Sequence, residues 1–262
     1  MSYFTLARDH PFEDRLALAG AAGFAGIGLY IGEYLRLREA GYDLARIADL
    51  VAEHDVSIAE IEVVRLGAPP EFETAAWEIA DAFESRYLQV IGPYDGTVSD
   101  AARLYAGICD RAADHGLVCG LEFLPFTNIV NARDAHQIVE LADRPNGGVC
   151  VDIWHHERGA NDPSMIDDIP AERITGIQMS DGPSVPELGD YFNECLRSRH
   201  APGTGAMDTV GFARRLLAKG LDLPWSLEVC NDDVWGADDG TVSSHVNAAA
   251  DGMRSVLAQA LS

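Results

Sequence analysis

Short runs of β-branched and apolar residues alternate with longer helical patterns along the whole chain. This alternation, with a spacing of about thirty residues, is typical of β–α units that build a parallel sheet. Eight is the strand number of a closed barrel, so the sequence predicts an α/β fold that is a single (β/α)8 TIM barrel. The expected strands are 3–7, 26–30, 56–62, 87–92, 117–123, 148–152, 174–179 and 225–229.

A length of 262 residues fits one such barrel, and no linker divides the chain, so we expect a single domain over 1–262. Helix patterns with start signals separate the strands: 43–54, a helix capped by Ser99 or Asp100, and one that begins at Asn131. The irregular region 181–207, with a helix expected over 187–199, predicts an extended loop at the barrel mouth, where substrate contacts are common.

Acidic residues outnumber basic ones by 42 to 19, which gives a net charge of −23. Such a field repels phosphate backbones and anionic lipid, so neither nucleic acid nor a membrane is an expected partner. No long apolar run or signal-peptide pattern occurs, and we expect a cytoplasmic protein. The five cysteines include no CxxC pair, which argues against a disulfide framework or a zinc knuckle. The sequence does not determine the oligomeric state, and a homo-oligomer is one possibility.

Four of the expected strands carry an oxygen-bearing side chain near the carboxyl end, where barrel active sites lie. Three carboxylates at one mouth repel one another unless a cation offsets them or their pKa values rise. We therefore predict one bound divalent metal ion, although any one of these acids alone would more often be a structural hydrogen-bonding group. The predicted ligands are Glu122, Asp152, Gln178 and Glu228.

Three carboxylates and an amide oxygen form an all-oxygen ligand set, which favours Mn²⁺ or Mg²⁺ over Zn²⁺. We expect Mn²⁺ first, with Mg²⁺ or Co²⁺ as substitutes. Ser180 and Asp181, directly after Gln178, are expected to support the ligands from behind.

These residues, in their order and local sequence, resemble the xylose isomerase-like superfamily over essentially the whole chain. That superfamily includes ketose 3-epimerases, inosose isomerases and dehydratases, and 3-dehydroshikimate dehydratases. The resemblance implies that the four predicted ligands bind the metal and that the two glutamates also exchange substrate protons. It further implies that His155 contacts a substrate oxygen or moves a proton, and that Arg199 holds a substrate hydroxyl, carbonyl or carboxylate. The resemblance rests on Glu122 in Gly-Leu-Glu-Phe-Leu-Pro, Asp152 followed by His155, Gln178 in Ile-Gln-Met-Ser-Asp, Arg199 before Pro202-Gly203-Thr204-Gly205, and Glu228.

Two departures weigh against a plain epimerase. Epimerases usually have histidine where Gln178 stands, whereas the dehydroshikimate dehydratases resemble this chain in having glutamine, and the ligand separations of 30, 26 and 50 residues also resemble theirs. The acidic residue often present on the second expected strand is absent, because Gly28-Leu29-Tyr30 stands there.

His156 and Trp154 are further candidates for substrate binding, the alternatives being a histidine satisfied by backbone and an aromatic packing residue. A Schiff-base mechanism is excluded, because the sole lysine, Lys219, lies in a helical segment. With few basic residues expected near the mouth, a neutral or carboxylated substrate is favoured over a phosphorylated one.

The functional hypothesis is a metal-dependent isomerase or epimerase acting on a keto-polyol or sugar, by proton abstraction next to the carbonyl and an enediolate intermediate. The first alternative is a metal-dependent lyase, either a 3-dehydroshikimate dehydratase-like enzyme or one that eliminates a β-oxygen group from a keto-sugar. An alternative of another class is a non-catalytic sugar-binding barrel or one subunit of a larger enzyme.

Overall fold

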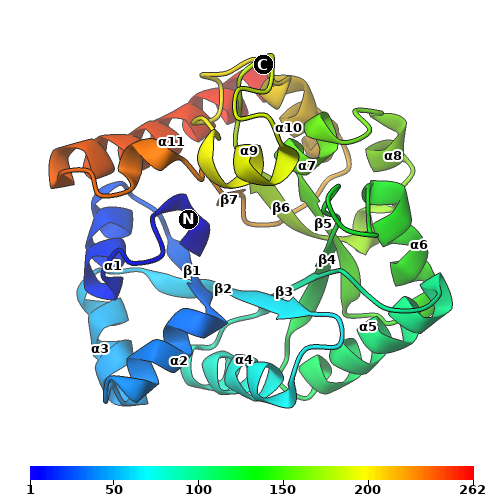
Figure 1. Cartoon of the computed structure of the whole chain (residues 1–262), viewed down its shortest axis with the longest axis horizontal. Helices are drawn as coiled ribbons and strands as arrows, with labels where there is room; N and C mark the ends of the chain where they lie inside the picture. The colour runs from blue at the N-terminus through cyan, green and yellow to red at the C-terminus, as the bar shows by residue number, and fades with distance from the viewer.

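The parallel sheet curls around a central axis with helices outside it (Figure 1). The computed structural model describes all residues from 1 to 262. Seven strands pair in chain order, and each neighbouring pair is parallel, so their carboxyl ends share one rim. They are β1 (Gly26–Tyr30), β2 (Ser57–Arg65), β3 (Tyr87–Ile91), β4 (Val118–Glu122), β5 (Gly147–Asp152), β6 (Ile174–Met179) and β7 (Ser226–Leu227).

The N-terminal segment lies between β1 and β7, where the first of eight strands was expected. The backbone nitrogen of Gly28 donates to the carbonyl of Met1 at 2.8 Å, and the nitrogen of Ser2 donates to that of Leu227 at 3.0 Å. The prediction of a strand over 3–7 is wrong: the Ser2 hydroxyl accepts from the nitrogen of Phe4 and turns the chain into the 3₁₀ turn η1 (Tyr3–Thr5). Two residues therefore bridge the sheet edges in place of an eighth strand.

Helices surround the sheet on its outer side, and no helix is long and apolar enough to cross a bilayer. The short α9 lies in front of the strands in Figure 1, within the region 181–207. The helices are α1 (Phe12–Ala21), α2 (Ile31–Glu39), α3 (Leu44–Glu53), α4 (Pro70–Phe83), α5 (Val98–Ala113), α6 (Ala132–Ala142), α7 (Ile153–Arg158), α8 (Ser164–Asp167), α9 (Tyr191–Arg197), α10 (Thr209–Ala218) and α11 (Asp239–Ala260), with 3₁₀ turns η2 (Ala171–Arg173) and η3 (Asp232–Val234).

Side-chain caps begin the helices much as the sequence predicts. Asp43 caps α3, and the prediction that Asn131 begins α6 is confirmed. The cap of α5 is Thr97 and not Ser99 or Asp100. The Thr97 hydroxyl accepts from the backbone nitrogen of Asp100, whose carboxylate accepts from the nitrogen of Thr97, so this capping box starts the helix earlier than expected.

Glycines inside the barrel make room for larger polar side chains from neighbouring strands. A Cβ atom on Gly28 would lie 1.6 Å from Oε1 of Glu62, so a side chain at this position has no space. Glu62 of β2 thus occupies the volume that an acidic residue on β1 would fill. Gly120 and Gly176 similarly leave room for Tyr87, because a Cβ on either would lie within 2.2 Å of its hydroxyl oxygen.

The region 181–207 is held to the rim by Asp181. Its carboxylate accepts from the backbone nitrogens of Gly203 at 3.0 Å and Met207 at 2.9 Å. Asp181 was expected to support the metal ligands. Its hydrogen bonds instead order this loop. The helix within the region is α9, which is shorter than the expected 187–199.

Candidate active site

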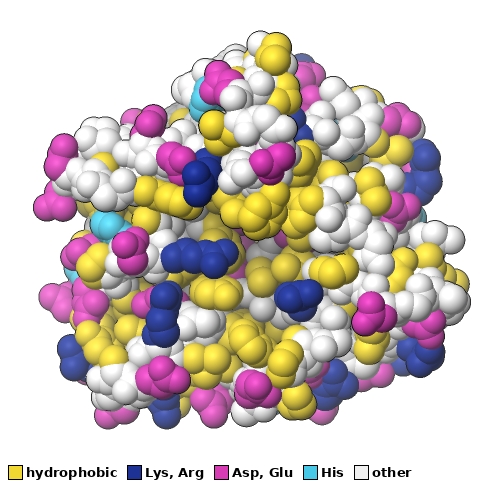
Figure 2. Space-filling view, in the orientation of Figure 1, with side chains coloured by type: hydrophobic (Ala, Val, Ile, Leu, Met, Phe, Trp, Pro, Cys, Tyr) yellow, Lys and Arg dark blue, Asp and Glu magenta, His cyan; other side chains and the backbone are white.

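A cavity of about 460 Å³ opens at the carboxyl ends of the strands and appears as the central hollow in Figure 2. Its walls are largely apolar, with Val63, Ile91 and Phe126 among the lining residues. Its basic and acidic lining residues are Arg8, Arg65, Glu122, His155, Arg199 and Glu228. Size, position and lining are those of a small-molecule site.

The three predicted carboxylates meet beneath this cavity. Glu122 ends β4, Asp152 ends β5, and Glu228 directly follows β7. One ligand atom from each, together with a ring nitrogen of His155, forms a set whose members all lie within 4.8 Å of one another. We call these four residues the acidic cluster. All four are buried, so their charges cannot be left to bulk water.

Gln178 stands beside this cluster on the next strand. It is the register partner of Asp152, so the two side chains leave the sheet on the same side. Its Oε1 lies 3.7 Å from the sulfur of Cys150, while its buried Nε2 has no partner. Carboxamide oxygen and nitrogen interchange by a flip, which would turn an acceptor to the unpartnered side. The buried Oε1 of Glu122 also lacks a hydrogen-bond partner, and with the amide of Gln178 flipped both residues present an unpartnered oxygen, as a cation site requires.

Arg199 already supplies one positive charge to the cluster. Its Nη1 lies 2.9 Å from Oδ2 of Asp152 and 3.0 Å from Oε2 of Glu228, and its side chain is only 2% exposed. Part of the positive charge that these carboxylates were expected to need therefore comes from the chain itself. One guanidinium does not balance three carboxylates, and Glu122 has no ion pair with it.

The pKa values follow from this unequal balance. Burial raises the pKa of Glu122 well above its ordinary range, and the charges of Glu228 and Asp152 add to the effect. Burial also raises the pKa of Glu228, to about 7, although Arg199 opposes the shift. Burial opposes ionisation of Asp152 as well, but Arg199 and His155 outweigh it and lower the pKa of this carboxyl. A divalent cation would relieve the repulsion that the guanidinium leaves.

Mn²⁺ is expected to raise the melting temperature more at pH 8 than at pH 6. Glu228 has a raised pKa in the folded protein, so its protonated form contributes stability that is fully present below the pKa of the unfolded chain. That stability is lost as the pH rises through the folded pKa of about 7. At pH 6 the metal must displace this proton, which costs about 1.4 kcal/mol, or about 3 °C in melting temperature. Melting curves with and without Mn²⁺ at both pH values test this; equal shifts would contradict it.

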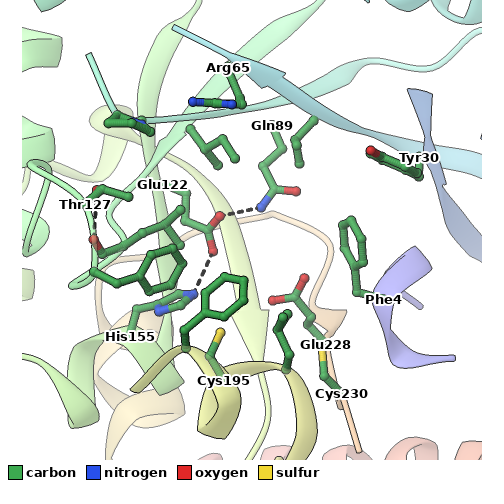
Figure 3. Close-up of a pocket in the computed structure, with 18 of the residues that line it drawn as sticks. Phe4, Tyr30, Arg65, Gln89, Glu122, Thr127, His155, Cys195, Glu228 and Cys230 are labelled. Carbon is green, nitrogen blue, oxygen red and sulfur yellow. Dashed lines mark hydrogen bonds and ion pairs between the residues drawn. The ribbon is translucent and has the colours of Figure 1, made fainter. Parts of the chain in front are cut away.

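His155 faces the cluster from α7. Its Nε2 lies 3.5 Å from Oε1 of Glu122, as Figure 3 shows, and 3.4 Å from Nη2 of Arg199. Burial lowers the pKa of His155 to about 4, so the ring is neutral near pH 7. Nη2 can only donate, so Nε2 accepts and Nδ1 carries the proton. Nδ1 then donates to the hydroxyl of Tyr191, 2.8 Å away on α9.

Tyr191→Phe is expected to lower kcat by roughly 10- to 100-fold with a smaller change in KM, because loss of a hydrogen bond that fixes a functional ring has this effect. The proton on His155 is expected to become distributed between both ring nitrogens, which ¹⁵N chemical shifts report. Tyr34→Phe, which removes a hydroxyl bonded to Glu78 on the helical surface, is the matched control. An unchanged tautomer with unchanged kcat would show that Tyr191 does not orient the ring.

The structure also adds polar residues that the sequence analysis did not select. Nε2 of Gln89 donates to Oε2 of Glu122 at 2.7 Å, which holds this oxygen and leaves Oε1 without a hydrogen-bond partner (Figure 3). The Ser2 hydroxyl lies 3.0 Å from Oε2 of Glu62 and 3.3 Å from Oε1 of Glu228. Gln89 interrupts an apolar strand just as the predicted ligands do, but it lies two residues before the strand end.

Two predicted substrate contacts lie away from the cavity. Trp154 is fully buried, does not line the cavity, and stacks against the guanidinium groups of Arg158 and Arg199 at 4.9 and 5.4 Å. The ring of His156 lies 6.0 Å from that of Phe212 on α10. Both follow Asp152 on a helix whose first turn points only some of its side chains at the barrel axis. Ser180 is buried, and its hydroxyl has no hydrogen-bond partner.

Two curated 3-dehydroshikimate dehydratases are similar in sequence. The one from Pseudomonas aeruginosa is 29% identical over 269 aligned residues, which cover 98% of this chain and 41% of that protein. The one from Pseudomonas putida is 37% identical over 149 residues, which cover 56% of this chain and 22% of that protein. The chain thus spans less than half the length of these relatives.

Among solved structures, an IOLI protein with a bound zinc atom has a TM-score of 0.85 and 16% identity, covering 98% of this chain and 97% of that one. This likeness concerns the fold. The family model described as xylose isomerase-like TIM barrel matches residues 16–258. The chain therefore belongs to the xylose isomerase-like TIM barrel family.

Proposed function

We propose that this chain is a metal-dependent lyase that removes water from a carboxylated keto-polyol of the 3-dehydroshikimate type, acting as one domain over residues 1–262. The observation that carries the proposal is the acidic cluster at the base of the cavity. Sequence similarity along 98% of the chain to a 3-dehydroshikimate dehydratase supports the substrate class. Gln178 also supports elimination, because epimerases usually have histidine at this position and dehydroshikimate dehydratases have glutamine.

Glu122, Asp152, Gln178 and Glu228 would hold the metal, with Mn²⁺ as the proposed ion and Mg²⁺ or Co²⁺ as alternatives. The unpartnered Oε1 of Glu122 and the unpartnered amide end of Gln178 support this set. When bound, the ion supplies Lewis-acid polarisation of a carbonyl, which contributes several kcal/mol to catalysis. His155 lies close enough to be a further ligand, and because its ring is neutral, its Nε2 has a lone pair that can bind the ion.

The two glutamates differ from Asp152 in that they line the cavity, whereas Asp152 does not. One glutamate would take the proton from the carbon next to the carbonyl. The C–O bond on the following carbon then breaks as a C=C bond forms, and the departing hydroxyl leaves as water with a proton from the other glutamate, whose raised pKa favours the protonated form. Arg199 would keep Asp152 ionised and in place throughout.

The isomerase or epimerase hypothesis shares the first of these steps and differs in the fate of the carbanion, which is reprotonated on carbon. The sequence analysis placed it first. We reverse that order, because one 3-dehydroshikimate dehydratase is similar along 98% of this chain and a second is similar along 56% of it. The non-catalytic binding barrel remains as an outcome of the test.

The test is incubation of the purified chain and Mn²⁺ with 3-dehydroshikimate, with inososes and with free ketoses. The expected result is a new ultraviolet-absorbing aromatic acid from 3-dehydroshikimate, formed only with metal. Deuterium uptake from solvent into a ketose or inosose without such a product would replace the lyase by an isomerase. A chain indifferent to metal that converts none of these compounds would favour the binding barrel.

A further inference from the structure

One basic side chain at the cavity has no partner within the protein. Every arginine in the chain other than Arg65, and the lysine, makes an ion pair, a hydrogen bond or an aromatic contact. Arg65 makes none of these, although acidic residues outnumber basic ones by 42 to 19. A guanidinium left free on so acidic a chain, at a cavity wall, is available to an anion from outside.

The place of Arg65 relative to the acidic cluster follows from the strand register. Arg65 at the end of β2 pairs with Ile91 of β3, which pairs with Glu122 of β4. The backbones of Arg65 and Glu122 are therefore two strand spacings apart, roughly 10 Å. Figure 3 shows Arg65 on the opposite side of Gln89 from Glu228, with the cavity between these groups. This span suits a six-membered ring with a functional group at each end.

The cavity is also divided by charge. Glu122 and Glu228 are buried in its lining beside Arg199, whose charge is paired with Glu228, while Arg8 and Arg65 line it with exposed side chains. Where few basic residues were expected near the mouth, Arg8, Arg65 and Arg199 line the cavity. Val63 of β2 and Ile91 of β3 add apolar surface to the lining. A substrate with a polar, metal-seeking end and an anionic end separated by carbon would match this division.

We propose that Arg65 binds the carboxylate of the substrate while the keto-polyol end lies over the acidic cluster. This inference rests on the proposed function for its substrate class. The planar guanidinium presents parallel N–H donors that match the two oxygens of a carboxylate. Arg65 thus selects carboxylated ring substrates over neutral sugars, and Arg8 adds charge at the same rim without the same freedom, because it lies 5.6 Å over the ring of Phe4.

The test measures binding of shikimate and of methyl shikimate by calorimetry to the full chain with Mn²⁺. These unreactive probes share the same ring and hydroxyl groups, and the ester replaces the anionic carboxylate with a neutral methyl ester. Wild type is expected to prefer the acid by roughly 10- to 100-fold, the range for a charge-assisted hydrogen-bonded pair. Arg65→Gln is expected to remove that preference, because it weakens binding of the acid and leaves binding of the ester unchanged. Arg65→Lys is expected to keep part of the preference, because lysine retains the charge as a point charge.

Arg38→Gln, an exposed arginine on α2 outside the cavity, is the control and should keep the wild-type preference. Failure of wild type to bind the acid, equal affinity for acid and ester, or an equal loss of both in Arg65→Gln overturns the proposal. A phosphorylated sugar that binds more tightly through Arg65 than shikimate does also overturns it. The preference for the acid can hold while 3-dehydroshikimate is not converted, and then only the proposed function fails.

Discussion

Glu122→Gln is expected to give a folded protein that has lost tight Mn²⁺ binding and turns over substrate at least about a thousand times more slowly. Removing an ionised ligand and proton carrier forfeits several kcal/mol, and each 1.36 kcal/mol is a factor of ten in rate. The same change removes a buried carboxyl whose pKa is raised by burial and by Glu228, so that its burial costs stability at pH values above its unfolded pKa. The metal-free variant is therefore expected to melt higher than wild type at pH 8.

This pairing of higher stability with lost function separates a site residue from a structural one, because a structural hydrogen-bonding acid would lose stability when changed. The measurements are metal titration by calorimetry, kcat, and melting curves at pH 8 without metal. Glu53→Gln on the exposed side of α3 is the matched control and should change none of them. Retained Mn²⁺ affinity, or a lower melting temperature together with normal turnover, would remove Glu122 from the site.

The meeting of the three carboxylates could be predicted because it depends on sheet geometry alone. Glu122 and Asp152 each end an apolar strand, and Glu228 follows one. Carboxyl ends of parallel strands share one rim, so strand order suffices to bring such residues together. The limits of β1, β3, β4, β5 and β6 were predicted to within one residue, since buried parallel strands are continuously apolar, whereas β2 runs past its expected end and β7 is shorter than expected.

The first strand and the region 181–207 could not be predicted, because their paths are set by contacts distant in sequence. The backbone of Ser2 pairs with Leu227 across the gap in the sheet, and Arg199 pairs with Cys230. Periodicity gives no information about such pairings. The resemblance selected Arg199, but helix periodicity gives no reason why its side chain is 2% exposed while that of Arg197 is 43% exposed.

Arg199→Met is expected to destabilise the metal-free protein by about 3–5 kcal/mol, the usual loss when one partner of a buried ion pair is removed. Asp152 and Glu228 would then lie buried near each other without the guanidinium that contacts both. Saturating Mn²⁺ is expected to restore a large part of the lost stability, because the ion supplies positive charge to the same carboxylates. Metal should therefore stabilise this variant more than it stabilises wild type.

The matched control is Arg197→Met, two residues earlier at the end of α9. That side chain pairs with Asp232 at 3.6 Å, and both partners are 43% exposed, so its loss should change the free energy of unfolding by less than about 1 kcal/mol. Urea unfolding of both variants with and without Mn²⁺ gives the four values needed. A small loss in metal-free Arg199→Met, or a large loss that Mn²⁺ leaves unchanged, would mean that the guanidinium and the metal do not act on the same carboxylates.

A double variant with Arg199→Met and Glu122→Gln tests whether net charge governs the stability of the cluster. Because it removes one positive and one negative charge, it should lower the free energy of unfolding less than Arg199→Met alone.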